Sequence, residues 1–156
     1  MTWTVIDPTP VGPLLLTTDG EALTRLWFGE KPVPGERDDD HPVLRRAVEQ
    51  LAEYFAGERD AFDLPLAPEG TAFQVRVWEQ LRLIPYGTTI SYGELARRVG
   101  NPAASRAVGL ANGRNPLAIV VPCHRVIGAN GSLTGFGGGM DAKRTLLDLE
   151  KGAALF

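Results

Sequence analysis

The fold of the C-terminal half is decided by residues 91–111, which read SYGELARRVGNPAASRAVGLA. Ser91 is a favourable N-cap, and the apolar stripe that ends at Val99 predicts a first short helix. Gly100-Asn101-Pro102 ends that helix, and a second one is expected over Ala103–Ala111. Two short helices joined by a tight, glycine-containing turn are typical of a helix-turn-helix, although many such pairs occur in all-α proteins that never touch DNA.

The sequence on either side of this pair predicts further helices. Thr71 is a candidate N-cap for a helix with one apolar face, and Pro85-Tyr86-Gly87 ends that segment. Met140–Lys151 predicts a closing helix with several leucines. Leu117–Val121 is an apolar run that we expect to be a buried strand-like segment, and the glycine-rich stretch Gly135–Gly139 must be a loop.

The N-terminal half has a different pattern. Short apolar runs separated by proline and glycine turns predict β-strands. From Pro42 the apolar period changes to that of an amphipathic helix, which ends near Gly57. We therefore expect an α/β (α+β) protein: a small N-terminal β-sheet plus helix domain with its linker (1–70), followed by a mainly helical C-terminal domain with a helix-turn-helix (71–156). The expected N-terminal strands are Trp3–Ile6, Leu14–Thr18, Leu23–Phe28 and an edge strand Phe62–Leu66, with a surface loop over residues 29–41.

Charge divides unevenly between the two halves. Residues 1–70 hold 6 Lys and Arg against 14 Asp and Glu, a net charge of −8. Residues 71–156 hold 10 against 5, a net charge of +5. A basic half beside an acidic one favours phosphate binding by the basic half, although a charge of this size also arises by chance.

Composition excludes several classes of protein. The chain has 156 residues and 44% hydrophobic content, and no run of 18 apolar residues that would predict a membrane span. Its one cysteine excludes an intrachain disulfide and a multi-cysteine zinc site. With no signal-peptide pattern at Met1–Asp7, the expected location is cytoplasmic.

That cysteine, Cys123, follows the apolar run and is itself followed by histidine and arginine in Pro122-Cys123-His124-Arg125-Val126. A thiol becomes a strong nucleophile as the thiolate, and a base or a nearby cation promotes that change. An unpaired cysteine is more often a small buried hydrophobe, and neighbours in sequence need not face each other. The motif alone therefore leaves both interpretations open.

The wider pattern resembles the O6-alkylguanine-DNA alkyltransferase family, in its constitutive single-module bacterial form. The resemblance covers Thr71 to about Gly152 and includes the family signature PCHRV at 122–126. Its other motifs stand in the family's order and spacing: Ile90-Ser91-Tyr92, Ser105–Gly109, Asn112–Pro116, Thr134–Gly139 and Glu150.

The resemblance implies an irreversible transfer of an alkyl group from O6-alkylguanine, with O4-alkylthymine as a second candidate substrate. Cys123 would be the acceptor, His124 the base acting through a water molecule, and Glu150 the carboxylate that orients the imidazole. Without the resemblance, Glu150 would be an ordinary solvated helix charge. Tyr92 would donate a hydrogen bond to the departing guanine. The residues implied around the base are Asn115, Val126, Phe136 and Gly137.

The resemblance also implies a bound partner, duplex DNA, entered through the minor groove with the damaged base flipped out. Arg106 would fill the vacated space, and Ser105 and Ala107 would lie against the DNA backbone beside it. Arg125 is expected to be a structural ion-pair or hydrogen-bond partner. No metal or organic cofactor is implied, and the protein is expected to be a monomer that can cluster along DNA.

Two other functions are compatible with parts of the pattern. A cysteine hydrolase would use the same cysteine–histidine–acid logic with repeated turnover, although no clear oxyanion motif is present. A non-catalytic sensor of alkylated DNA would share the fold, but such proteins lack the acceptor cysteine.

Overall fold

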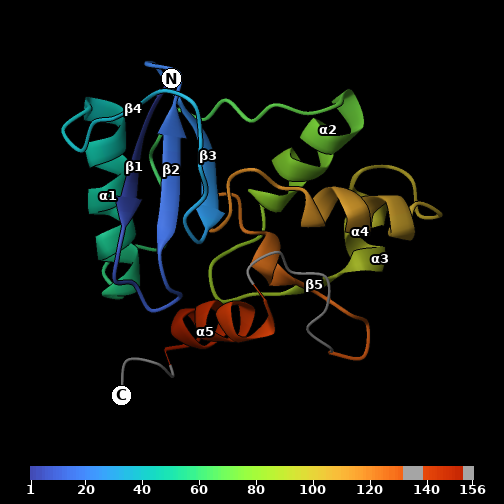
Figure 1. Ribbon diagram of the computed structural model, residues 1–156. Coiled ribbons are helices and arrows are strands. Elements are labelled where there is room, and N and C mark those ends of the chain that lie inside the picture. The colour runs from blue at the N-terminus through green and yellow to red at the C-terminus, as the bar shows by residue number, and fades with distance from the viewer. Residues whose placement is uncertain (132–138, 153–156) are drawn as a thin grey trace.

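The computed structural model describes residues 1–131 and 139–152. The expected α/β fold class is confirmed: a four-stranded sheet with one helix precedes a mainly helical half (Figure 1). The sheet has the order β3-β2-β1-β4. Its strands are β1 (Thr2–Ile6), β2 (Leu14–Thr18), β3 (Leu23–Phe28) and β4 (Glu36–Arg37). The first three pair antiparallel, and β4 pairs parallel with β1.

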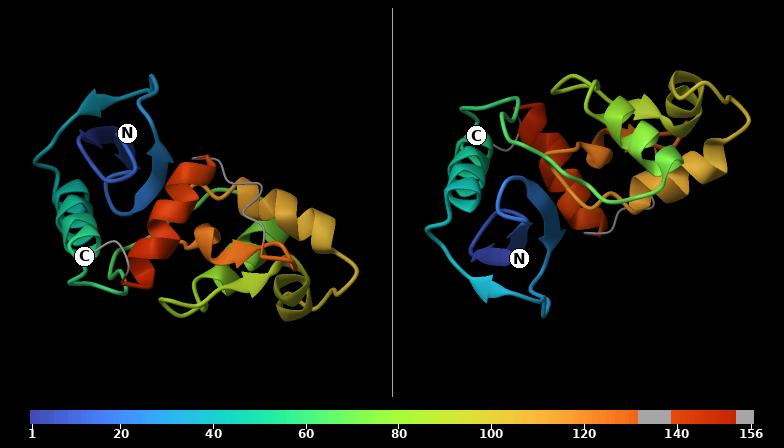
Figure 2. Two further views of the ribbon diagram at one scale, coloured as in Figure 1. Left: turned by 90° about the horizontal axis from the view of Figure 1, so that it is seen from below. Right: turned by 90° about the horizontal axis from the view of Figure 1, so that it is seen from above.

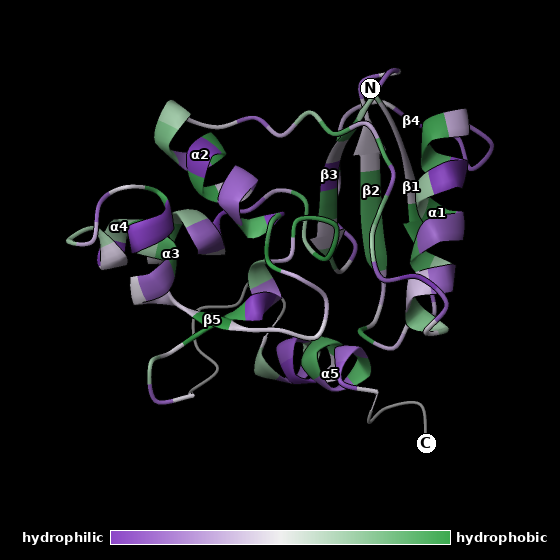
Figure 3. Cartoon of the chain, turned by 180° about the vertical axis from the view of Figure 1, so that it is seen from behind, coloured by the Kyte–Doolittle hydropathy of each residue, from purple (hydrophilic) through white to green (hydrophobic). Residues whose placement is uncertain are grey.

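One helix, α1 (Pro42–Phe55), covers a face of this sheet. It begins at the N-cap His41, whose Nδ1 accepts a hydrogen bond from the Val43 amide at 3.2 Å. Its inner side chains are fully buried, and the colours of Figure 3 alternate along the helix as expected when only one face meets a sheet. Those inner residues include Leu44, Ala47, Leu51 and Tyr54.

The described part of the C-terminal half contains four α-helices. α2 (Ala72–Leu81) starts with the predicted N-cap Thr71, which forms a complete capping box with Gln74. α3 (Tyr92–Arg98) starts at the predicted N-cap Ser91. α4 (Ser105–Gly113) completes the helix pair two residues later than expected. α5 (Met140–Glu150) lies at the lower end of the molecule in Figure 1, and seen from above or below it projects between the N-terminal sheet and the other C-terminal helices (Figure 2).

A cluster of buried apolar side chains joins both halves. It contains Leu16 and Leu26 from the sheet, Leu51 from α1, and Leu95 and Leu146 from the C-terminal half. No described helix has the length and apolar character that crossing a membrane requires.

Three local predictions were wrong. The loop predicted at 29–41 contains the short strand β4. Phe62–Leu66 forms no strand, since only Leu66 bridges to Leu23. Leu117–Val121 is a buried turn, because Ile119 has a left-handed φ of 71° and only Leu117 bridges to the sheet, at Leu26.

The sequence also gave no sign of a second, two-stranded sheet. There β5 (Ile90–Ser91) pairs in parallel with β6 (Val126–Ile127). This pairing sets the start of α3 beside the chain that leaves Cys123. The predicted loop Gly135–Gly139 falls outside the described residues except for Gly139.

Candidate active site

The turn before Cys123 is fixed by backbone and asparagine hydrogen bonds. Asn115 accepts a bond from the Leu117 amide at 3.0 Å and donates one to the Val121 carbonyl at 2.7 Å. Asn112 donates to the Cys123 carbonyl at 3.3 Å. A β-branched residue with a positive φ, such as Ile119, is strained and persists only where its surroundings enforce that conformation. These contacts therefore define where the thiol lies.

Cys123 begins a one-turn 3₁₀ helix, Cys123–Arg125, that packs against α5. The turn carries the side chains of His124 and Arg125 to Glu150 at the end of α5. His124 Nε2 lies 2.6 Å from Glu150 Oε2. The Arg125 guanidinium donates to both oxygens of the same carboxylate, at 2.7 Å and 3.0 Å. Arg125 also donates to the Ile84 carbonyl at 2.7 Å, which agrees with the structural role expected for it.

Glu150 is an anion in this setting. Burial alone would raise the pKa of its carboxyl group, but the hydrogen bonds from His124, Arg125 and Tyr54 lower that pKa to about 2. A carboxylate only accepts hydrogen bonds, so Nε2 of His124 must carry the proton that lies between them. Burial lowers the pKa of the imidazole, which keeps the ring neutral. The other nitrogen, Nδ1, is then unprotonated and finds no hydrogen-bond partner among the described residues.

Cys123 is buried, with 5% of the residue exposed. Burial raises its pKa, and the hydrogen bond from Asn115 and the positive charge of Lys143 offset this only in part. Lys143 on α5 is itself fully buried and donates to the Val126 carbonyl at 2.6 Å. The resting site is therefore a neutral thiol beside a neutral imidazole, so the thiol needs a base before it can react.

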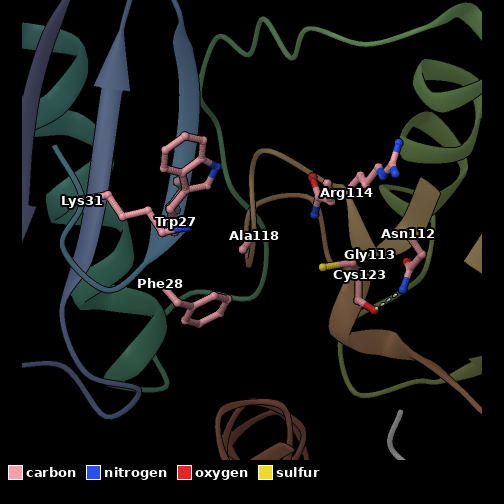
Figure 4. Close-up of a pocket in the computed structure, with 10 residues that line it drawn as sticks. Trp27, Phe28, Lys31, Asn112, Gly113, Arg114, Ala118 and Cys123 are labelled. Carbon is pink, nitrogen blue, oxygen red and sulfur yellow. Dashed lines mark hydrogen bonds between the residues drawn. The ribbon is translucent and has the colours of Figure 1, made fainter. Parts of the chain in front are cut away.

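A pocket of about 350 Å³ opens beside the thiol. Figure 4 shows Sγ of Cys123 directed from the C-terminal half toward Ala118 and the N-terminal sheet. The lining residues come from β3 and the segment after it, from the end of α4, and from the turn before Cys123. They are Leu26, Trp27, Phe28, Lys31, Asn112, Gly113, Arg114, Asn115, Ala118 and Cys123.

The remaining predicted residues lie around this centre. Tyr92 is the first residue of α3, and its ring borders α4 so closely that a Cβ at Gly109 would lie 3.8 Å from it. Val126 is buried in β6. Ser105, Arg106 and Ala107 form the first turn of α4, where Arg106 and Ala107 are exposed and Ser105 is partly exposed. Phe136 and Gly137 lie outside the described residues.

Three polar contributors were missed by the sequence analysis. Tyr54 of α1 donates a hydrogen bond to Glu150 Oε2 at 2.6 Å. Asn112 and Lys143 hold the carbonyls of Cys123 and Val126. Asn112 stood in the motif Asn112–Pro116 but was given no role, and Tyr54 gave a signal because a tyrosine on the apolar face of a helix needs a buried partner for its hydroxyl. Within the described ranges, no cluster of three or more metal-ligating side chains occurs.

Two family models match this chain. Residues 72–152 match the model of the 6-O-methylguanine DNA methyltransferase DNA-binding domain, and residues 1–68 match that of its ribonuclease-like domain. A methylated-DNA–protein-cysteine methyltransferase of Methanosarcina acetivorans is 56% identical over 149 residues, covering 93% of this chain and 96% of the relative. One of Mycobacterium tuberculosis is 55% identical over 148 residues, covering 93% and 90%.

Solved structures give the same result. A crystal structure of Mycobacterium tuberculosis OGT in complex with DNA superposes with a TM-score of 0.90 at 52% identity, covering 98% of this chain and 94% of that one. An O6-methylguanine DNA methyltransferase from Methanococcus jannaschii superposes with a TM-score of 0.72 at 28% identity, covering 95% and 93%. The chain belongs to the 6-O-methylguanine DNA methyltransferase family.

Proposed function

We propose that this protein repairs O6-alkylguanine in duplex DNA by transferring the alkyl group irreversibly to Cys123. His124 Nδ1 takes the thiol proton through a water molecule, and an electron pair of Sγ attacks the alkyl carbon. The bond from that carbon to O6 breaks with its electrons moving to guanine. Guanine takes up one proton in exchange, and a thioether remains on the protein. The observation that carries the proposal is the buried contact of His124 Nε2 with Glu150, which leaves Nδ1 as the base.

The helix pair α3–α4 supplies the DNA side of the proposal. The exposed face of α4 carries Arg106, Ala107 and Leu110, so one cation stands beside small and apolar side chains. Such a face suits the narrow minor groove. Arg106 occupies the space that the flipped base leaves in the base stack of the duplex. Tyr92 donates a hydrogen bond to the departing guanine. Asn115 and Val126 support the turn and strand on either side of Cys123, consistent with a role at the edge of the base site.

Three further expectations belong to the same proposal. The division at residue 70 is supported by the two family models, which match on either side of it. A cytoplasmic location and a monomer that clusters along DNA are proposed from the sequence and from the reaction.

The test is the intact mass of the protein after reaction with an excess of duplex containing O6-methylguanine. We expect one added methyl group per chain, none with Cys123→Ser, and no further product after one equivalent. Continued product formation would favour a cysteine hydrolase. Tight binding of the modified duplex without any mass gain would favour a non-catalytic sensor.

A further inference from the structure

Two buried polar atoms next to Cys123 lack a hydrogen-bond partner among the described residues. They are Nδ1 of His124 and Oδ1, the side-chain oxygen of Asn112. No other buried side-chain nitrogen or oxygen in the described ranges is left without a partner. Asn112 is 1% exposed and His124 is fully buried. Because an unsatisfied buried polar group is costly, two of them around one residue indicate a further group that binds both.

Asn112 and His124 adjoin the same peptide bond. The amide nitrogen of Asn112, Nδ2, donates to the Cys123 carbonyl at 3.3 Å, which Figure 4 marks with a dashed line. That carbonyl belongs to the peptide bond that joins Cys123 to His124. The contact also identifies Oδ1 as the unpaired end of the amide, because the reverse orientation would place two oxygens against each other. Asn112 therefore presents an unpaired oxygen in the same buried centre as the proposed base.

Both atoms are acceptors, so neither can satisfy the other. His124 Nδ1 is unprotonated because Nε2 carries the ring proton toward Glu150, and an amide oxygen only accepts. The Cys123 thiol has a single hydrogen and can satisfy only one of them. A water molecule donates two hydrogen bonds and accepts others, and buried waters are typically held by about three polar partners. Asn112 and Cys123 both line the pocket beside the thiol, which brings solvent to them.

We propose, on the basis of the proposed function, that Asn112 is a positioning residue for the water that carries the thiol proton. Asn112 Oδ1 accepts one hydrogen of this water, and His124 Nδ1 accepts the other. A lone pair of the water oxygen is then directed to the S–H group of Cys123. This role differs from that of Asn115, whose side chain bonds to the backbone on either side of Ile119 and holds the turn.

The proton transfer conserves the water. The S–H proton of Cys123 moves to the water oxygen while the O–H proton that faces His124 moves to Nδ1. The imidazole becomes a cation, which the Glu150 carboxylate stabilises, and Sγ keeps the electron pair that attacks the alkyl carbon. Asn112 gains and loses no proton. Its contribution is the orientation of the water, so it should matter only while His124 is present as the base.

The test is a double-mutant cycle on the single-turnover rate constant for methyl transfer from an O6-methylguanine duplex. Asn112→Leu, which removes both polar ends at similar size, should slow transfer roughly ten- to a hundredfold, a part of what general base catalysis contributes. In the His124→Gln protein, which has no base, Asn112→Leu should slow transfer by no more than about twofold, because coupled residues are not additive. Asn115→Ala is the matched control. It should slow transfer by the same factor with and without His124, since it acts on the turn.

A second measurement needs no variant and decides the matter if Asn112→Leu does not fold. A high-resolution crystal structure of the unreacted protein should show one water within about 3.2 Å of both Asn112 Oδ1 and His124 Nδ1. A water bonded to His124 alone, or an equal slowing by Asn112→Leu in both backgrounds, would overturn the inference and leave the proposed function intact. If the wild-type protein transfers no methyl group, the proposed function itself has failed.

Discussion

The hydroxyl of Tyr54 on α1 donates a 2.6 Å hydrogen bond to Glu150 Oε2 on α5. The same oxygen contacts His124 Nε2, so the N-terminal half takes part in fixing the imidazole behind Cys123. Burial and the neighbouring Glu150 charge raise the pKa of this phenol, which therefore stays protonated and remains a donor. Arg125 donates to both oxygens of the Glu150 carboxylate, and Tyr54 donates to Oε2, so each oxygen has a hydrogen-bond donor.

Tyr54→Phe should slow alkyl transfer while keeping the fold. The variant retains the ring that packs against Phe62 and Tyr86, but removes one donor from a buried carboxylate. We expect a loss of about 2 kcal/mol in the free energy of unfolding, the usual cost for a hydrogen bond to a charged group. Single-turnover kinetics and chemical denaturation measure the two effects. Tyr86→Phe is the control, because the Tyr86 hydroxyl makes only a 3.4 Å contact with the Leu149 carbonyl. Equal rates in wild type and Tyr54→Phe would show that Tyr54 only packs.

Acid should destabilise the protein through Glu150. The pKa of this carboxyl group is depressed from 4.5 to about 2 in the folded protein, so its contribution is complete above pH 4.5 and is lost as the pH falls toward 2. At 1.36 kcal/mol for each pKa unit, the contribution is roughly 3 kcal/mol. The free energy of unfolding of wild type should therefore fall more steeply over this window than that of Glu150→Gln. Parallel curves for the two proteins would exclude the linkage.

The elements with local signals were predictable. The strands β1–β3 and the helices α1, α2 and α5 follow from apolar periodicity, proline and glycine turns, and N-caps that a short window contains. The conformation of Leu117–Val121 was not predictable, because an apolar run is compatible with both a buried strand and a buried turn. Its conformation depends on the φ of Ile119 and on backbone bonds to Leu26, which the local sequence does not encode.

Some residues of the candidate site were also predictable from the sequence, and others were not. Cys123, His124 and Glu150 were identified through the motif and the family resemblance, and the structure brings the last two into contact. Tyr54 lies in the amphipathic helix predicted from Pro42, but its partner Glu150 is 96 residues away in the sequence, so the local pattern does not indicate their contact. Lys143 in a helix of ordinary polarity gives no indication of full burial, which depends on the tertiary packing of α5.

Lys143→Met should make the Cys123 thiol less acidic. The buried ammonium of Lys143 lowers the pKa of this thiol, so its removal raises that pKa and reduces the thiolate fraction at neutral pH. The midpoint of the pH dependence of alkylation by iodoacetamide should move upward, and methyl transfer should slow. Lys151→Met serves as the control, because Lys151 is exposed and follows α5 directly. A midpoint that stays in place in Lys143→Met would exclude the electrostatic effect.

Arg106→Ala should separate base flipping from chemistry. Arg106 is exposed in the first turn of α4, whereas Cys123, His124 and Glu150, to which we assign the transfer, are buried. Losing it removes what compensates the unpaired base, worth a few kcal/mol by the usual cost of unstacking, so repair of duplex lesions should fall steeply. Transfer from free O6-benzylguanine needs no flipping and should hardly change. If Arg106 reaches a phosphate, the salt dependence of DNA binding should also decrease by about one unit of slope. An equal slowing of both reactions would mean that Arg106 supports the fold or the Cys123 turn, and that another residue fills the vacated stack.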